Sequence, residues 1–151
     1  MLGQINLDTL AGKAILQISS RPDILSIVEI GTWNGAGSTR CVLHGIQDKP
    51  ESTFYSLECN EGWYEKAIAH IPPQDNVHLL LGKIVEENDL DISDLVGDEP
   101  LYLKGDLAAM KEVPNVLDQI PAKIDFLILD GGEFSTTAEL DKLIDRSNYI
   151  F

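Results

Sequence analysis

The sequence has few basic residues, few cysteines and no long apolar run. Its 151 residues include 11 Lys and Arg against 25 Asp and Glu, which gives a formal net charge of −14 at pH 7. Because an acidic surface repels phosphate, nucleic acid and anionic membranes are poor partners. No apolar stretch approaches the ~20 residues that a membrane-spanning helix needs, and the N-terminus lacks the pattern of a signal peptide. We therefore expect a soluble cytoplasmic protein.

The cysteines and histidines show no ligand-like spacing. Cys41 and Cys59 form no C-x-x-C pair and have no histidine at metal-ligand spacing. His44, His70 and His78 lie in predicted helices or in a predicted strand and do not cluster with acids. We expect the cysteines to be small buried hydrophobes in a reducing compartment, and the histidines to have ordinary surface or core roles.

Short apolar strands alternate with helical segments along the chain. Strands are predicted at Ile24–Ile30, Thr53–Glu58, Val77–Leu81 and Ile124–Leu129, and Tyr149–Phe151 has the pattern of a fifth strand beginning. Helices are predicted at Leu7–Ser20, where Asp8 can start the helix, and at Ser38–Ile46, Glu61–Ile71 and Thr136–Arg146. This alternation predicts an α/β fold, a Rossmann-like three-layer sandwich with a mostly parallel central sheet.

The stretch Ile84–Pro121 is harder to interpret, because it is acidic and is broken by glycine and proline. It has the pattern of a crossover enlarged by an insertion. A short extra strand is predicted at Leu101–Leu103 and a helix at Met110–Ile120. The acidic part, Glu86–Asp98, is most simply a solvated insertion.

A glycine-rich turn follows the first strand. Gly31, Gly35 and Gly37 are three glycines within seven residues. Gly31 permits backbone angles that other residues resist, and the later glycines allow a ligand to approach the main chain. The free N–H groups at the start of the next helix, for which Ser38 is a plausible cap, can face a polar or anionic group. This pattern favours a ligand site over a turn that serves packing alone.

An acidic residue, Glu58, ends the second strand. A carboxylate there can accept both hydroxyl hydrogens of a ribose. Right-handed crossovers place the turns after Glu29, Glu58, Gly82 and Asp130 on one edge of the sheet. Ligands of open α/β sheets bind at this edge. Because an NAD-binding domain uses the same carboxylate, Glu58 indicates a nucleoside without identifying it.

The order of Glu29 followed by the glycine turn resembles the first motif of class I methyltransferases, which use S-adenosylmethionine. The resemblance implies that Gly31 and Gly35 pack on the methionine part of the cofactor and that Glu29 helps to position its amino group. It implies that Glu58 binds the ribose. The cofactor-binding residues predicted in this way are Glu29, Gly31, Thr32, Trp33, Gly35, Ser38, Glu58, Cys59 and Asp130.

The end of the fourth strand, Phe126–Ser135, resembles that of small-molecule O-methyltransferases and of the cephalosporin-hydroxylase-like group. Those proteins often read Ile-Asp-Gly-Asp-His-Ser-Tyr, whereas Gly132 and Glu133 replace the Asp-His pair here. In metal-dependent members the first Asp binds Mg²⁺, so Asp130 is the candidate magnesium ligand. Loss of the histidine removes a candidate general base, and no catalytic residue is assigned.

Two other features bear on the resemblance. Lys83 follows Gly82 where many relatives carry an acid near the adenine, and Glu86 is a possible substitute. The chain stops inside an apolar segment, whereas the complete fold usually has seven strands. We therefore expect one domain, residues 1–151, that is C-terminally incomplete and lacks its last strands. An exposed strand edge would then favour a homo-oligomer.

The sequence thus predicts methyl transfer from S-adenosylmethionine to a small-molecule or sugar-type acceptor, at oxygen. Three alternatives stay open. The first is an enzyme that uses NAD or a nucleotide sugar, although the G-x-G-x-x-G motif is absent. The second is a non-catalytic methyltransferase-like binding domain. The third is a fragment that binds weakly because its fold is incomplete.

Overall fold

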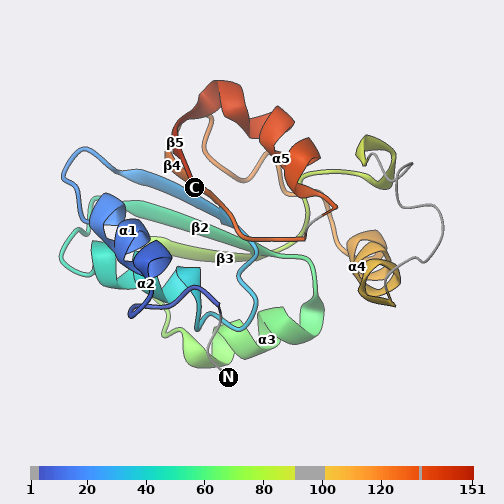
Figure 1. Ribbon diagram of the computed structural model, residues 1–151, viewed down its shortest axis with the longest axis horizontal. Helices are drawn as coiled ribbons and strands as arrows, with labels where there is room; N and C mark the ends of the chain where they lie inside the picture. Colours follow the sequence, from blue (N-terminus) through green and yellow to red (C-terminus); the bar gives the residue numbers. More distant parts are fainter. Residues whose placement is uncertain (1–3, 91–100, 133) are drawn as a thin grey trace.

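Five parallel strands form one sheet in the order β3-β2-β1-β4-β5 (Figure 1). The computed structural model describes residues 4–90, 101–132 and 134–151. The strands are β1 (Ser26–Ile30), β2 (Thr53–Glu58), β3 (Val77–Leu81), β4 (Ile124–Leu129) and β5 (Ser147–Ile150). Because the chain runs outward from β1 to β3 and returns to β4 on the other side of β1, the strand order reverses between β1 and β4. Ligands of open α/β sheets bind at such a switch point.

Helices cover both faces of the sheet. They are α1 (Leu10–Ser19), α2 (Ser38–Ile46), α3 (Glu61–His70), α4 (Leu101–Glu112) and α5 (Thr136–Leu143), with short 3₁₀ turns at Glu87–Asp89 and Ile144–Arg146. Alternate residues of β1 point to opposite sides, so Ile27 packs with α1 and α2 whereas Val28 packs in the cluster that contains Leu143 of α5. Figure 1 shows α1 and α2 on one side of the sheet and α5 on the other. The predicted Rossmann-like three-layer α/β sandwich is confirmed.

Several predicted helix boundaries were wrong. Leu101–Leu103 begin α4 instead of forming a strand, and the helix ends at Glu112, well before Ile120. Pro114 accounts for the end, because a proline disfavours helical backbone angles in the residue before it. At the N-terminus, α1 begins at Leu10 and is capped by the Thr9 side chain, which accepts the Gly12 N–H, so Asp8 is not the cap.

The C-terminal segment also differs in detail from the prediction. The helix predicted at Thr136–Arg146 is α5 followed by a 3₁₀ turn, and β5 begins at Ser147, two residues early. Phe151 still pairs with β4, since its N–H donates to the carbonyl of Leu127 at 2.9 Å. Within the described ranges, no helix combines the length and the apolarity that crossing a membrane would require.

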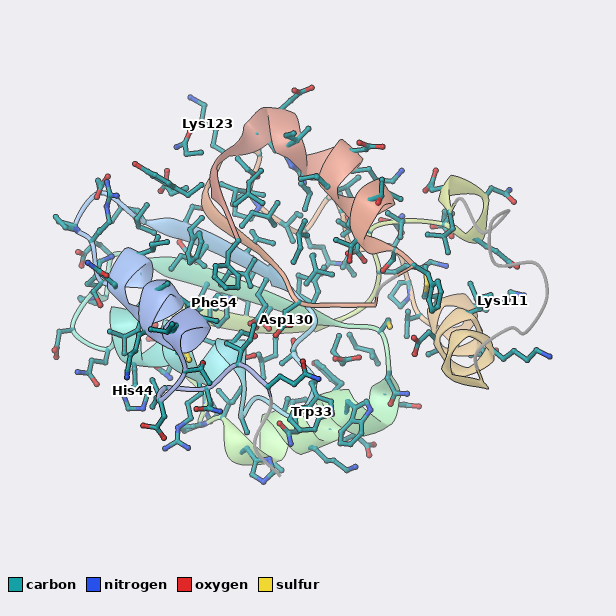
Figure 2. All side chains as sticks on the ribbon, viewed as in Figure 1. Trp33, His44, Phe54, Lys111, Lys123 and Asp130 are labelled. Atoms are coloured by element: carbon teal, nitrogen blue, oxygen red, sulfur yellow. The ribbon has the colours of Figure 1, made fainter. Side chains whose placement is uncertain are left out.

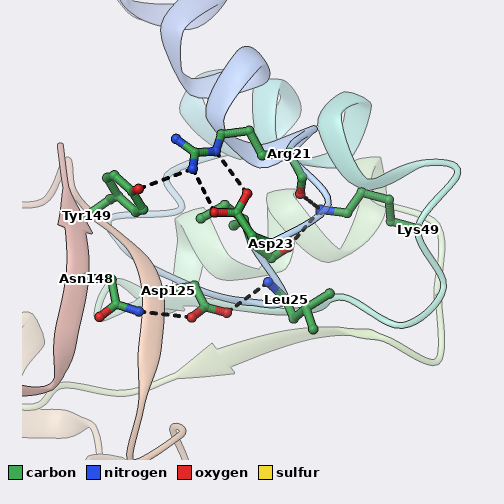
Figure 3. Close-up of polar contacts among 8 residues, drawn as sticks. Arg21, Asp23, Leu25, Lys49, Asp125, Asn148 and Tyr149 are labelled. Carbon is green, nitrogen blue, oxygen red and sulfur yellow. Dashed lines mark hydrogen bonds and ion pairs between the residues drawn. The ribbon is translucent and has the colours of Figure 1, made fainter.

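The amino-terminal edge of the sheet is closed by a buried lysine (Figure 3). Lys49, only 9 % exposed, donates from its ammonium to the carbonyl oxygens of Ser19, Arg21 and Ile24 at 2.9, 2.6 and 2.7 Å. The ammonium thus joins three backbone carbonyls, of which that of Arg21 also accepts the Ile24 N–H and that of Ile24 also accepts the Ser52 hydroxyl. A charge-assisted bond of this kind is stronger than a neutral one.

Two acids complete this edge. Asp125 of β4 accepts the N–H groups of Leu25 and Ser26 at 2.9 and 3.0 Å, which ties the start of β1 to β4. Arg21 forms a two-point ion pair with Asp23, and its guanidinium also donates to the Tyr149 hydroxyl (Figure 3). The charged groups that Figure 3 draws therefore serve to join neighbouring segments.

Candidate functional site

The turn after β1 is packed directly against the end of β4. Gly31 has φ +101°, and a Cβ at this position would lie 2.3 Å from the backbone oxygen of Asp130. Trp33 and Gly35 also have positive φ, at 51° and 76°. The N–H groups of Gly31 and of the next residue both donate to the carbonyl of Leu57 on β2. Glycine at position 31 is therefore required by both backbone angle and space.

Glu29 lies beneath this turn and is fully buried. Its Oε2 accepts the hydroxyl groups of Thr39 and Ser56 at 2.6 and 2.5 Å. Its Oε1 has no hydrogen-bond partner among the described residues. Burial raises the pKa of Glu29 to about 7, although the hydroxyl groups favour the ionised form and oppose this effect. The carboxylate thus links β1 to Thr39 of α2 and to Ser56 of β2.

A cavity of about 250 Å³ opens at the carboxyl edge of the sheet, beside the switch point. The turn after β1, the ends of β2 and β4, and residues of α3, α4 and α5 all line it. Among the lining residues are Asp130, which Figure 2 labels at the end of the sheet, and Trp33, which it labels beside α3. The cavity therefore occupies the position at which this topology binds ligands.

Both carboxylate oxygens of Glu58, which lines the cavity, accept backbone hydrogen bonds. The residue ends β2 and is 8 % exposed. One oxygen, Oε2, accepts the backbone N–H of Trp33 at 2.7 Å, and Oε1 accepts that of Asn60 at 2.8 Å. Each oxygen keeps a further lone pair, so the fixed carboxylate can still accept two hydroxyl groups of a ligand. Burial raises the pKa of Glu58, and the backbone bonds oppose the rise.

The cavity is rich in acids. Asp106, Asp130 and Glu139 line it together with Glu58. Partial desolvation raises the pKa of Asp106 and Asp130, although both residues are exposed, and burial raises that of Glu139 to about 7. Lys83 is the lysine that lines the cavity within the described part of the chain, and its ammonium is paired with Glu86 at 2.8 Å. A positively charged ligand is therefore favoured over an anionic one.

Two tryptophans form an aromatic wall. The ring centroids of Trp33 and Trp63 are 5.3 Å apart with an interplanar angle of 51°, and both residues line the cavity. The ammonium of Lys66 lies 3.8 Å from the centre of the Trp63 ring. Aromatic side chains in this arrangement offer a flat apolar surface against which a planar ligand group can stack.

Cys59 also lines the cavity, next to Glu58. Burial, followed by the nearby carboxylates, raises the pKa of its thiol to about 12. The thiol therefore stays protonated at neutral pH and is a poor nucleophile. Its place in the site is that of a small lining residue.

The structure brings together only part of the predicted cofactor site. Lining the cavity are Gly31, Trp33, Glu58, Cys59 and Asp130, whereas Glu29, Thr32, Gly35 and Ser38 lie outside its lining. Gly35 instead packs against Ile71, whose Cδ1 would lie 2.6 Å from an added Cβ.

The predicted cap of α2 was wrong. The N-cap residue is Gly37, which has no side chain to accept a bond, and Ser38 is the first helical residue. The Ser38 hydroxyl donates to Oδ2 of Asp130 at 2.8 Å. This bond joins the start of α2 to the end of β4 across the switch point.

The residues do not fit a magnesium site. Over the described ranges, no three His, Cys, Asp or Glu side chains gather closely enough to hold a metal ion. Asp130, the predicted ligand, instead accepts the Ser38 hydroxyl. We therefore assign no metal to this cavity.

Among the lining residues that the sequence did not predict are Trp63, Asp106 and Glu139. For Glu139 a signal was present, because Ser135, Glu139 and Leu143 are spaced four residues apart and share the buried face of α5. An acid on an otherwise buried helical face marks a position whose environment is unusual. The positions of Trp63 and Asp106 depend on how α3 and α4 pack, which local spacing does not give.

Two solved structures that are described as methyltransferases share the fold of this chain. The chain is similar to PaMTH1, a methyltransferase of Podospora anserina solved with S-adenosylhomocysteine bound. The TM-score is 0.60 at 14 % sequence identity, and the match covers 89 % of this chain and 46 % of PaMTH1. The chain is also similar to a Staphylococcus aureus protein assigned as a caffeoyl-CoA O-methyltransferase, with a TM-score of 0.56, 16 % identity and coverage of 93 % and 53 %.

The chain thus spans about half the length of each of these two structures. No known family profile matches the sequence. No curated protein matches it either.

Proposed function

We propose that this chain binds S-adenosylmethionine in the cavity at the carboxyl edge and transfers its methyl group to a small-molecule or sugar-type acceptor, at oxygen. Glu58 carries the proposal. Its two oxygens are fixed by the N–H groups of Trp33 and Asn60 beside the glycine turn, in the place where a ribose diol would lie. The choice of oxygen follows the similarity of Phe126–Ser135 to small-molecule O-methyltransferases.

The charge of the cavity supports this cofactor over NAD. S-Adenosylmethionine carries a sulfonium and an ammonium group, and both suit a cavity lined by Glu58, Asp106, Asp130 and Glu139. A dinucleotide would bring a pyrophosphate, which such a cavity repels. The start of α2, where a pyrophosphate binds in dinucleotide folds, is engaged with Asp130 through Ser38. The acidic cavity thus favours the methyl donor.

Different residues of the cavity would bind and orient the different parts of the cofactor. The bound sulfonium would supply an electrophilic methyl group, and the chain would orient it. Glu58 holds the ribose, the Trp33–Trp63 wall gives a planar group an apolar surface, and the Gly31 turn allows the ligand close to the main chain. Holding donor and acceptor in line supplies much of the rate of such a transfer.

Calorimetric titration with S-adenosylhomocysteine and with NAD tests the cofactor. We expect micromolar binding of S-adenosylhomocysteine and no binding of NAD. In Glu58→Gln, loss of the carboxylate should weaken S-adenosylhomocysteine binding by ~1–3 kcal/mol, or roughly 5- to 150-fold. Glu65→Gln, an exposed acid of α3, is the matched control and should bind as the wild type does. Equal binding by the Glu58 variant would refute the ribose role, and preference for NAD would refute the proposed cofactor.

A further inference from the structure

Glu139 is the one lining carboxylate described here that combines deep burial with an unused oxygen. It is 5 % exposed, projects from α5 and lines the cavity. Its Oε2 has no hydrogen-bond partner among the described residues. The same oxygen would lie 3.8 Å from a Cβ built on Gly131, which places it beside the end of β4. An unpartnered buried carboxylate oxygen is costly, so a ligand that donates to it gains more than it would at an exposed acid.

The surroundings of Glu139 favour a cationic donor. The titratable groups that line the same cavity are Glu58 and Cys59 at the end of β2, Asp106 of α4, Asp130 at the end of β4, and Lys83 after β3. Three of these are acids, Cys59 stays protonated, and the Lys83 ammonium is already paired with Glu86. No free positive charge is therefore supplied by these groups. A neutral hydroxyl could satisfy Oε2, but only a cation would also offset the clustered negative charge.

We propose that Glu139 binds an ammonium group, in a subsite of the cavity between α5 and the end of β4. The inference rests on the proposed function, because the ammonium comes from one of the two molecules that function requires. One source is an amine on the acceptor. The other is the amino group at the methionine end of S-adenosylmethionine. In either case the buried carboxylate selects for positive charge. Where the acceptor supplies the ammonium, the carboxylate also excludes an acceptor that presents a carboxylate or phosphate at this point.

The proposal predicts a pH dependence of known sign. Burial raises the pKa of Glu139 to about 7, although the Ser135 side chain opposes the rise, so the carboxylate is mostly protonated at pH 6 and mostly ionised at pH 8. An aliphatic ammonium, with a pKa of ~10, stays charged over this range. Binding through Glu139 should therefore tighten as pH rises from 6 to 8. The same tightening should be absent when residue 139 cannot ionise.

The test uses Glu139→Gln, which keeps the shape and removes the charge. Asp141→Asn changes an exposed acid on the same helix and is the matched control, and Glu139→Asp tests rescue by a shorter carboxylate. Circular dichroism and thermal unfolding of each variant establish that it is folded. Binding is measured by calorimetry at pH 6 and pH 8.

Two pairs of probes distinguish the sources of the ammonium. The first pair is S-adenosylhomocysteine and 5′-methylthioadenosine, which lacks the amino-acid end. The second pair, added to protein saturated with S-adenosylhomocysteine, is tyramine and tyrosol, which share a phenol and differ in an amine against a hydroxyl. If the acceptor supplies the ammonium, wild-type protein should prefer tyramine at least tenfold at pH 8, and Glu139→Gln should abolish that preference while S-adenosylhomocysteine binding is unchanged.

If the cofactor supplies the ammonium, Glu139→Gln should weaken S-adenosylhomocysteine at least tenfold and leave 5′-methylthioadenosine unchanged. Either result supports the ammonium subsite. Equal behaviour of Glu139→Gln and wild type with all four probes would overturn it, as would equal losses in Asp141→Asn. If the wild type binds neither S-adenosylhomocysteine nor 5′-methylthioadenosine, the proposed function is overturned and the inference with it. Failure of the ammonium subsite alone is thereby distinguished from failure of the proposed function.

Discussion

The two edges of the sheet use charged residues in opposite ways. At the amino edge, the Lys49 ammonium has three carbonyl partners and Asp125 accepts two backbone N–H groups (Figure 3). At the carboxyl edge, Glu29 and Glu139 are also buried, yet each has one oxygen without a partner among the described residues. The pKa of each of these two acids is raised to about 7. One edge uses buried charge to fasten segments, whereas the other keeps unused bonding capacity next to a cavity.

The difference gives a physical criterion for separating structural from functional charge. A buried charge with its partners in place contributes to stability and has nothing left to offer a ligand. A buried carboxylate with an unused oxygen lowers stability unless something donates to it, and strongly perturbed groups of this kind gather at functional sites. Variants at each edge should accordingly separate stability from binding.

The largest effect is expected from Lys49→Met at the amino edge. Three carbonyl oxygens would lose a charged donor in a buried place, which should lower the free energy of unfolding by about 4 kcal/mol. Urea denaturation measures this loss, with Lys13→Met, an exposed lysine of α1, as the control. Affinity for S-adenosylhomocysteine should be unchanged under conditions in which the variant is folded. A stability equal to that of the control would show that the lysine does not fasten this edge.

Gly31→Ala should affect both stability and binding, because Gly31 lies at the carboxyl edge and also packs against Asp130, the residue that follows β4. The added Cβ would lie 2.3 Å from the Asp130 backbone oxygen, and φ is +101°. We expect a loss of about 3 kcal/mol and weakened S-adenosylhomocysteine binding. The control is Gly105→Ala in α4, where a Cβ meets nothing within 4 Å. That change should stabilise the protein by about 1 kcal/mol, and a similar result at position 31 would contradict the close packing.

Of the three substitutions at the two edges, Glu29→Gln should have the smallest effect, and it should increase stability. The raised pKa means that the folded state binds a proton more tightly than the unfolded state, so wild-type stability should fall as pH rises from about 4.5 through about 7. The glutamine cannot ionise, and its oxygen can still accept the Thr39 and Ser56 hydroxyl groups. At pH 8 the variant should therefore be more stable than wild type by about 2 kcal/mol, whereas at pH 5 the two should be nearly equal. Urea midpoints of the variant and of wild type at both pH values measure the effect. The same difference between the two proteins at pH 5 and at pH 8 would contradict the prediction.

Much of the fold was predictable because strands and helices of this class have strong local signals. The apolar runs of β2, β3 and β4 and the helix Ser38–Ile46 were located to the residue. Prediction failed between Ile84 and Pro121, where acidic residues, glycine and proline weaken the periodicity. The sequence around Leu101 contains good helix formers, but the three apolar residues Leu101–Leu103, taken by themselves, have the pattern of a short strand.

The site was predictable only where a motif fixes the backbone. The predicted residues that line the cavity lie at strand ends or shortly after them, and the topology brings strand ends to one edge. They are Gly31, Trp33, Glu58, Cys59 and Asp130. Glu29 was also predicted as a site residue, but the alternation of side chains along β1 directs it beneath the turn, away from the cavity lining. Trp63, Asp106 and Glu139 reach the cavity from helices, so their inclusion depends on packing that no single segment encodes.

The aromatic wall has a practical consequence. The chain contains two tryptophans, Trp33 and Trp63, and both line the cavity. All of the indole emission of this 151-residue chain therefore originates beside the cavity. A ligand that stacks on either ring, or that alters the 5.3 Å contact between them, should change the fluorescence of the unlabelled protein. The native sequence thus carries its own optical reporter of occupancy, suited to screening acceptor libraries without a coupled assay.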